Sequence, residues 1–208
     1  SLAIHSIPYK KEELVRFEEV FVKYENWSGM PQSFSIGSGQ HILLSGPNGS
    51  GKSSLLKALM NRIPYQGKIF ASSDLVISYV GQTCESVHGT IDEYIGQYAI
   101  DRTLFMTILR KLGFSRTELF HPLEQLSAGQ RRKIMLARSL CEPAHLFVWD
   151  EPLNDLDIAA REQMEEMLLS GNYAMLFVEH DQTFCEKIAT ERIQFGENGS
   201  HLKNDVLN

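Results

Sequence analysis

Residues 46–53, Gly-Pro-Asn-Gly-Ser-Gly-Lys-Ser, match the phosphate-loop pattern G-x-x-x-x-G-K-[ST] at every fixed position. The glycines at 46, 49 and 51 allow backbone conformations that a Cβ forbids, so successive N–H groups can point at phosphate oxygens. In this pattern Lys52 reaches the β- and γ-phosphates, and the Ser53 hydroxyl takes a position on Mg²⁺. The chemistry that these residues offer is the binding of a nucleoside triphosphate with magnesium.

The phosphate loop needs a buried strand before it and a helix after it, and both flanks fit. Residues 41–45, HILLS, form a short apolar run, and residues 53–60 carry apolar side chains at helical spacing. The start of that helix adds N–H groups and the positive end of its dipole. The expected nucleotide contacts are Gly46, Asn48, Gly49, Ser50, Gly51, Lys52, Ser53 and Ser54. The alternative interpretation is a glycine-rich turn before an ordinary helix.

Two carboxylates, Asp150 and Glu151, follow a second apolar run, LFVW. A buried parallel strand delivers such residues to the carboxyl edge of a sheet, where ligands of open α/β sheets bind. We expect Asp150 to hold Mg²⁺, through water, and Glu151 to polarise the attacking water as general base. The alternative is an acidic loop after a core strand.

A third motif, LSAGQ at residues 126–130, marks the start of a helix. Ser127 can cap this helix and Gln130 has the capping-box position. Ser127, the flexible Gly129 and the helix N-terminus also form a second phosphate-binding surface. Because one γ-phosphate cannot easily be held by both surfaces within one domain, we predict a site shared between two copies. A well-capped helix with a solvated basic face is the alternative.

Composition limits the class of protein. A chain of 208 residues with 43% hydrophobic residues fits one α/β domain with a sizeable core. The net charge of −6 gives no global basic field, so we expect no direct DNA binding. The three cysteines are widely spaced, which indicates neither a disulfide framework nor a zinc site and fits a cytoplasmic location. No apolar run approaches the roughly 18 residues that span a bilayer.

The elements that must position the motifs begin with β structure. We expect residues 1–13 to be a poorly ordered tail or linker remnant and residues 14–208 to form a single domain. Residues 14–24 and 32–36 are predicted to form an antiparallel layer, and residues 68–70 and 75–80 to be further strands.

The middle of the chain changes to helical spacing, with a capping-box pattern at Thr90 and Glu93. We predict a helical insertion at about 84–123, with helices at 90–99 and 102–112. Helices at 127–140, 158–169 and 182–189 then alternate with strands at 145–149 and 174–178, which predicts a largely parallel sheet with helices on both faces. Residues 197–200 indicate a hairpin turn.

Together the motifs resemble the ATP-binding cassette (ABC) ATPases from about Phe17 to Phe195. The phosphate loop resembles Walker A, LFVWDE resembles Walker B, and LSAGQ is similar to the family signature LSGGQ with Ala128 for the first glycine. The resemblance implies an α/β P-loop NTPase fold: a mostly parallel sheet flanked by helices, an antiparallel β layer and a helical insertion. It also implies that Ser127, Gly129 and Gln130 contact ATP bound by an opposing cassette.

The same resemblance implies roles for single residues. Gln82 lies where the family's glutamine binds Mg²⁺ and water, and His180 is similar to the histidine that contacts the γ-phosphate. Tyr24 occupies the place of the aromatic residue that stacks on adenine, an interaction of about 1 to 3 kcal/mol. Residues 154–157 resemble the family's D-loop. A structural histidine and a strand-end tyrosine are the alternatives for His180 and Tyr24.

Within the family, EPLNDLD at 151–157 is similar to the EP-x-N-x-LD form of the ABC-F proteins, and HDQTF at 180–184 resembles their HD-x-x-F. Residues 137–157 and 177–190 look most like ABC-F ATPases associated with resistance to ribosome-targeting antibiotics. Those proteins carry two cassettes joined by a helical linker and lack membrane domains. The resemblance therefore implies a second cassette, starting just after the linker, that hydrolyses ATP and acts on the ribosome.

Two other functions stay open. The first is a nucleotide-binding subunit of a membrane transporter, in which separate subunits supply the membrane part. The second is a non-catalytic module that uses ATP only as a clamp. An altered Glu151 or His180 would favour the clamp, and both residues are present.

Overall fold

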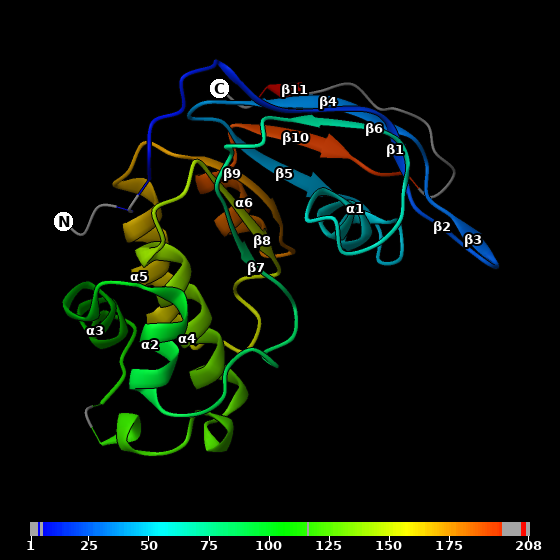
Figure 1. Ribbon diagram of the computed structural model, residues 1–208. Coiled ribbons are helices and arrows are strands. Elements are labelled where there is room, and N and C mark those ends of the chain that lie inside the picture. Colours follow the sequence, from blue (N-terminus) through cyan, green and yellow to red (C-terminus); the bar gives the residue numbers. More distant parts are fainter. Residues whose placement is uncertain (1–3, 5, 116, 197–204, 207–208) are drawn as a thin grey trace.

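The structure, a computed structural model, describes residues 4, 6–115, 117–196 and 205–206. Its central sheet has the strand order β11-β10-β5-β9-β8-β7, in which β11 is antiparallel to β10 and the other neighbours are parallel (Figure 1). The strands are β5 (His41–Ser45), β7 (Ile77–Val80), β8 (Leu146–Asp150), β9 (Ala174–Val178), β10 (Glu191–Gln194) and β11 (Asp205–Val206). Because the parallel strands run the same way, the loops after β5, β7, β8 and β9 leave from one edge of the sheet.

A separate antiparallel sheet has the order β4-β1-β6. It comprises β1 (Glu13–Phe21), β4 (Gln32–Gly37) and β6 (Gln66–Ala71), while β2 (Lys23–Tyr24) pairs with β3 (Trp27–Ser28) in a small hairpin. The predicted antiparallel layer is therefore confirmed. The two strands predicted at 68–70 and 75–80 belong to different sheets. The first lies in this sheet as β6, and the second lies in the parallel sheet as β7.

Alternation along the buried strands divides the core between two faces of the parallel sheet. One face packs with the antiparallel sheet and with helix α1 (Lys52–Leu59), through side chains that include Ile42, Leu44, Val148 and Leu176. The other face packs against helices and includes Leu43, Phe147, Trp149 and Phe177. These helices are α2 (Ile91–Tyr98), α3 (Arg102–Lys111), α4 (Ala128–Cys141), α5 (Ile158–Leu169) and α6 (Gln182–Ile188).

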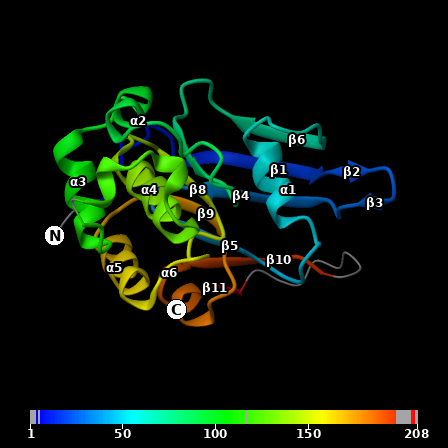
Figure 2. The ribbon, with the colours of Figure 1, turned by 90° about the horizontal axis from the view of Figure 1, so that it is seen from below.

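Figures 1 and 2 show α4, α5 and α6 beside the parallel sheet, with α2 and α3 farther out against α4. Two 3₁₀ turns, Glu118–Phe120 and Leu123–Gln125, connect α3 to α4. The predicted helices are confirmed with small shifts of their ends. Both capping boxes are formed, Thr90 with Glu93 at α2 and Ser127 with Gln130 at α4.

Two described residues of the segment that was expected to be a poorly ordered tail contact the domain. Ile4 is 7% exposed and belongs to the core, and Ser6 forms a parallel bridge with Ala144. Burial of the Ile4 side chain and the bridge to Ala144, two residues before β8, hold these residues against the domain. No strand was predicted at β10, which pairs with β5. The predicted hairpin turn at 197–200 lies outside the described residues.

Within the described part of the chain, no helix combines the length and the apolar character that a membrane span requires.

Candidate nucleotide site

The phosphate loop leaves β5 against the end of β10. Gly46 has φ +136°, and a Cβ built on it would lie 2.2 Å from the carbonyl oxygen of Phe195. Glycine is therefore required here both by conformation and by the approach of a second chain segment. The loop ends at Gly51, φ +101°, where α1 begins without a side-chain cap among the described residues. Such a helix start presents backbone donors to an anion.

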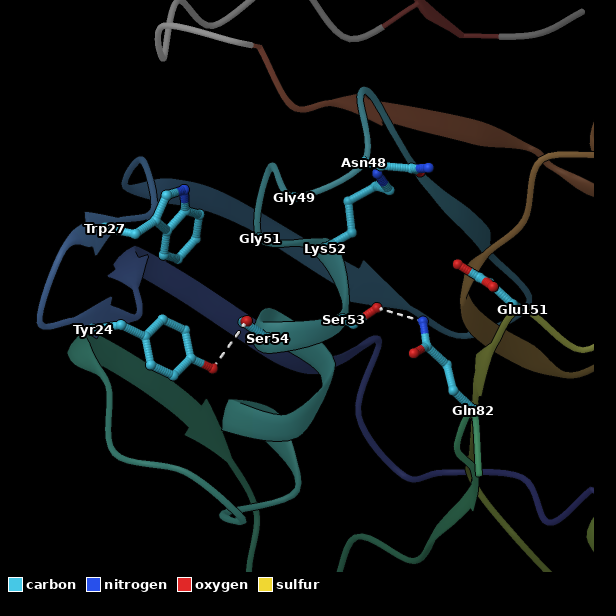
Figure 3. A pocket seen from close by; sticks show the side chains of 10 residues that line it. All are labelled: Tyr24, Trp27, Asn48, Gly49, Gly51, Lys52, Ser53, Ser54, Gln82 and Glu151. Atoms are coloured by element: carbon cyan, nitrogen blue, oxygen red, sulfur yellow. Dashed lines mark hydrogen bonds between the residues drawn. The ribbon is translucent and has the colours of Figure 1, made fainter. Parts of the chain in front are cut away.

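A pocket of about 520 Å³ opens beside this loop. Figure 3 shows its walls: the phosphate loop in the middle, two aromatic rings on one side, and Gln82 and Glu151 on the other. The lining residues are Tyr24, Trp27, Asn48, Gly49, Gly51, Lys52, Ser53, Ser54, Gln82 and Glu151. Gly46 and Ser50, also expected to contact nucleotide, do not line it, and Ser50 faces a neighbouring hollow with Pro47.

Lys52 folds back over the loop. Its Nζ donates to the carbonyl oxygens of Gly46 and Pro47, both at 2.7 Å, and the residue is 6% exposed. Burial lowers the pKa of the Lys52 ammonium, and the carboxylates of Glu151 and Asp150 oppose that shift. In a complex with a nucleotide, phosphate oxygens would replace these carbonyls as acceptors.

Ser53, Gln82 and Asp150 converge from three elements. The Ser53 hydroxyl donates to Asp150 Oδ1 at 3.0 Å, and Gln82 Nε2 donates to Ser53 Oγ at 3.1 Å (Figure 3) and to Asp150 Oδ1 at 3.4 Å. Asp150 is fully buried, and its Oδ2 has no hydrogen-bond partner among the described residues. Burial raises the pKa of the Asp150 carboxyl, while the bond from Ser53 opposes the shift.

This cluster fits the ligand chemistry of Mg²⁺. The hydroxyl, amide and carboxylate oxygens are hard donors, and the orphaned Asp150 Oδ2 is a buried acceptor that a cation or its water would satisfy. A cage of three or more His, Cys, Asp or Glu side chains does not occur in the described ranges. The fit is therefore to a magnesium ion that brings its own phosphate and water ligands, rather than to a protein-only metal site.

Glu151 and His180 meet at the carboxyl edge of the sheet. Glu151 Oε1 lies 3.3 Å from His180 Nε2, and its Oε2 accepts from Asn154 Nδ2 at 2.5 Å. Glu151 has φ +52°, a left-handed conformation that costs a non-glycine residue free energy. Glu151 lines the pocket, whereas His180 does not line it but contacts Glu151.

The aromatic wall contains a residue that sequence reasoning missed. Tyr24, 49% exposed, directs its hydroxyl to Ser54 Oγ at 3.3 Å. Trp27 stands beside it with ring centroids 5.8 Å apart, and its Cζ/Cη edge would touch a Cβ at Gly51. The β2–β3 hairpin that turns both rings toward the loop was not predicted. The sequence therefore offered only one indication of Trp27, a second aromatic side chain shortly after Tyr24.

The structure does not bring Ser127, Gly129 and Gln130 to this pocket. Ser127 and Gln130 bond to each other in the capping box, and a Cβ on Gly129 would lie 2.5 Å from Asp155 O. Helices α1 and α4 lie apart in both Figure 1 and Figure 2. The two candidate phosphate surfaces are thus separate within one chain.

The phosphate loop, the adjacent acids and the layered fold agree with a comparison to protein families. The family model described as ABC transporter matches residues 30–154. The chain belongs to the ABC transporter family. It is an ATP-binding cassette, and the match extends over the phosphate loop and both acids of the site.

The names of the relatives of this cassette indicate different functions. It is 32% identical to the Bacillus subtilis ribosome protection protein VmlR over 84% of the chain and 32% of VmlR. It is also 32% identical to the zinc import ATP-binding protein ZnuC of Acinetobacter baylyi, over 81% of the chain and 68% of ZnuC. The chain spans about a third of the length of the first curated relatives that it matches.

The solved structure of a putative cobalt transport ATP-binding protein shares the fold of this cassette. The TM-score is 0.81 at 22% identity, over 93% of this chain and 80% of that one. The α/β architecture, with its parallel sheet and separate antiparallel sheet, is thus that of the family.

Proposed function

We propose that this cassette hydrolyses ATP with Mg²⁺ at the pocket beside its phosphate loop. The observation that carries the proposal is the convergence of Ser53, Gln82 and Asp150 on one point, with Glu151 facing the same pocket. Binding alone needs the loop, whereas hydrolysis also needs a base beside the terminal phosphate. Glu151 supplies that base directly after β8, which is separated by β9 from the strand that leads into the phosphate loop.

Each residue has a role that follows from its place. Lys52 exchanges the carbonyls of Gly46 and Pro47 for phosphate oxygens. Ser53, Gln82 and Asp150 would hold Mg²⁺, which would neutralise charge that develops on the phosphates. Glu151 accepts the proton of the attacking water.

His180 orients Glu151 through the 3.3 Å contact and presents its ring toward the γ-phosphate. At the far side of the pocket, Tyr24 and Trp27 offer ring faces to the base.

The second phosphate surface completes the site of another cassette. Ser127, Gly129 and Gln130 lie at a capped helix start that does not reach the pocket of their own chain. In a pair of cassettes they close on the ATP held by the partner, and hydrolysis lets the pair open. Hydrolysis therefore depends on pairing, either with a second cassette of the same parent protein or with another copy.

Glu151→Gln tests the catalytic role directly. The amide keeps the size of the side chain but cannot accept the proton, so turnover should fall by about 10²-fold or more while ATP binding is retained. Steady-state phosphate release and titration of a fluorescent ATP analogue measure the two effects in the full-length protein. Glu166→Gln on the exposed side of α5 is the matched control. Unchanged turnover in Glu151→Gln would contradict the proposal.

We further propose that the parent protein acts on the ribosome in the manner of the ABC-F proteins. The similarity to VmlR supports this, and so do the motifs at residues 151–157 and 180–184, which resemble those of ABC-F proteins. Trapped in its ATP-bound pair, the Glu151→Gln protein should co-sediment with ribosomes in an ATP-dependent way. Sedimentation that is independent of ATP, or that matches an unrelated protein, would count against it.

A transporter subunit is the second candidate, because ZnuC shares as much identity and matches this cassette over most of its own length. Recovery of the protein with membranes rather than ribosomes would favour that function. A clamp without turnover is the third candidate, and ATP-dependent pairing with no phosphate release would identify it.

A further inference from the structure

Glu179 directly follows β9 and is buried at the carboxyl edge of the sheet. The residue is 7% exposed and does not line the pocket. Removal of a carboxylate from water costs free energy unless its oxygens accept hydrogen bonds. The partners of Glu179 therefore indicate what this residue does.

The two oxygens of Glu179 hold two different loops. Oε1 accepts from the backbone N–H of His180 at 2.7 Å and of Asp181 at 3.3 Å, both in the loop after β9. Oε2 accepts from the backbone N–H of Leu153 at 3.0 Å, in the loop after β8. One carboxylate thus joins the loop that carries His180 to the loop that carries Glu151.

Each loop also has an anchor of its own, so the Glu179 carboxylate links two segments that are held near each other. The loop after β8 is held where the Glu151 N–H donates to Val178 O at 2.9 Å, and Leu153 is 2% exposed in the core. The loop after β9 is held by Asp181, which caps α6 through the Phe184 N–H. The Glu151–His180 contact of 3.3 Å lies between these anchored points.

We propose that Glu179 is a positioning residue that sets the distance between Glu151 and His180 by clamping the loops after β8 and β9. The inference rests on the proposed ATP hydrolysis, in which Glu151 is the base. Glu179 touches neither nucleotide nor water in this scheme. It acts through His180, whose backbone N–H it binds.

Glu179→Gln is the first test, because glutamine has the same length but only one oxygen that can accept. It can hold one loop but not both. In the full-length protein we expect a kcat roughly 10-fold lower, the scale of lost supporting hydrogen bonds around a site, with the affinity for ATP within about twofold of wild type. Glu186→Gln, an exposed position on α6, is the matched control and should leave kcat unchanged.

A double-mutant cycle with His180→Ala separates positioning from simple structural support. If Glu179 acts through His180, Glu179→Gln should lower kcat in the wild-type background but change it less than about twofold when His180 is absent. An equal loss in both backgrounds would overturn the proposal. An unchanged kcat in His180→Ala would also overturn it, since His180 would then transmit nothing, although hydrolysis by Glu151 would stand.

Amide hydrogen exchange in the nucleotide-free protein gives a readout that needs no turnover. Loss of its bond to Glu179 should make the Leu153 N–H exchange about 10-fold faster in Glu179→Gln, with amides of β8 unaffected. Glu179→Asp, which keeps the charge but is too short to span both loops, should give the same pattern and serves if the glutamine variant folds poorly. Unchanged exchange at Leu153 in a folded variant would refute the clamp. Absence of ATP hydrolysis in the wild type would instead contradict the proposed function.

Discussion

At the residue scale, Lys52 at the start of α1 and Asp150 at the end of β8 are two side chains of opposite charge that are buried near the same pocket. Lys52 is 6% exposed and Asp150 is fully buried. Burial lowers the pKa of the Lys52 ammonium and raises the pKa of the Asp150 carboxyl, so in each case it disfavours the charged form. A triphosphate beside Lys52 and a cation beside Asp150 would reverse both effects. Under the proposed function, nucleotide and Mg²⁺ would therefore offset the cost of burying these two charges.

Lys52→Ala tests this at the level of one side chain. Loss of a charge-assisted contact to phosphate should weaken ATP affinity by roughly 10- to 100-fold. Titration with a fluorescent ATP analogue measures the change, and Lys68→Ala on an exposed position of β6 is the control. Equal affinities for both variants would show that Lys52 does not reach the phosphates.

At the scale of elements, α4 joins the two phosphate surfaces. Its first turn carries the Ser127–Gln130 capping box, and one turn later the buried Arg132 crosses to the strand that ends in the pocket. The Arg132 guanidinium donates to Gly81 O at 2.6 Å and to Gln82 O at 2.5 Å. The backbone that presents Gln82 to Ser53 is therefore fixed by the helix that presents Ser127.

Arg132→Met should destabilise the domain, because the side chain fills the same space but leaves both carbonyls without their charged donor. We expect a loss of about 2 to 3 kcal/mol in the free energy of unfolding, measured by urea denaturation. Arg110→Met on the exposed face of α3 should change it by less than about 0.5 kcal/mol. A loss no larger than that of the control would show that the carbonyls find other donors.

At the scale of the whole molecule, the two candidate phosphate surfaces are separate within one chain, so the proposed hydrolysis requires a pair of cassettes. Turnover per cassette should rise with protein concentration when only single cassettes are present. Concentration-independent turnover of isolated cassettes would contradict the shared site.

Complementation between two inactive variants tests the same point more sharply. Ser127→Asp keeps a good N-cap for α4 but repels phosphate, and Glu151→Gln lacks the base. In an equal mixture, each mixed pair contains one site with an intact Glu151 facing an intact Ser127. We expect about a quarter of wild-type phosphate release, since half of the pairs are mixed and each has one working site. Release equal to the sum of the separate variants would rule out sharing between copies.

Prediction from sequence succeeded where a signal is local. The helix at 158–169 and the strand at 174–178 have the predicted bounds, because the spacing of apolar residues and the flanking turn residues determine such elements. The capping boxes at Thr90 and Ser127 are contained within four residues each. The packing of Ile4 had no such local signal, since the value of burying it depends on a surface that only the folded domain provides.

The sequence by itself determined the phosphate loop, its flanking strand and helix, and the acids after LFVW, because each is encoded by residues within one turn or one strand. Only the tertiary structure decided that Ser53 and Asp150, 97 residues apart, lie 3.0 Å from each other. It alone turned Trp27 toward the pocket and set Glu179 between two loops. The reason is physical: spacing fixes which side of an element a residue occupies, whereas strand order and packing fix which elements meet.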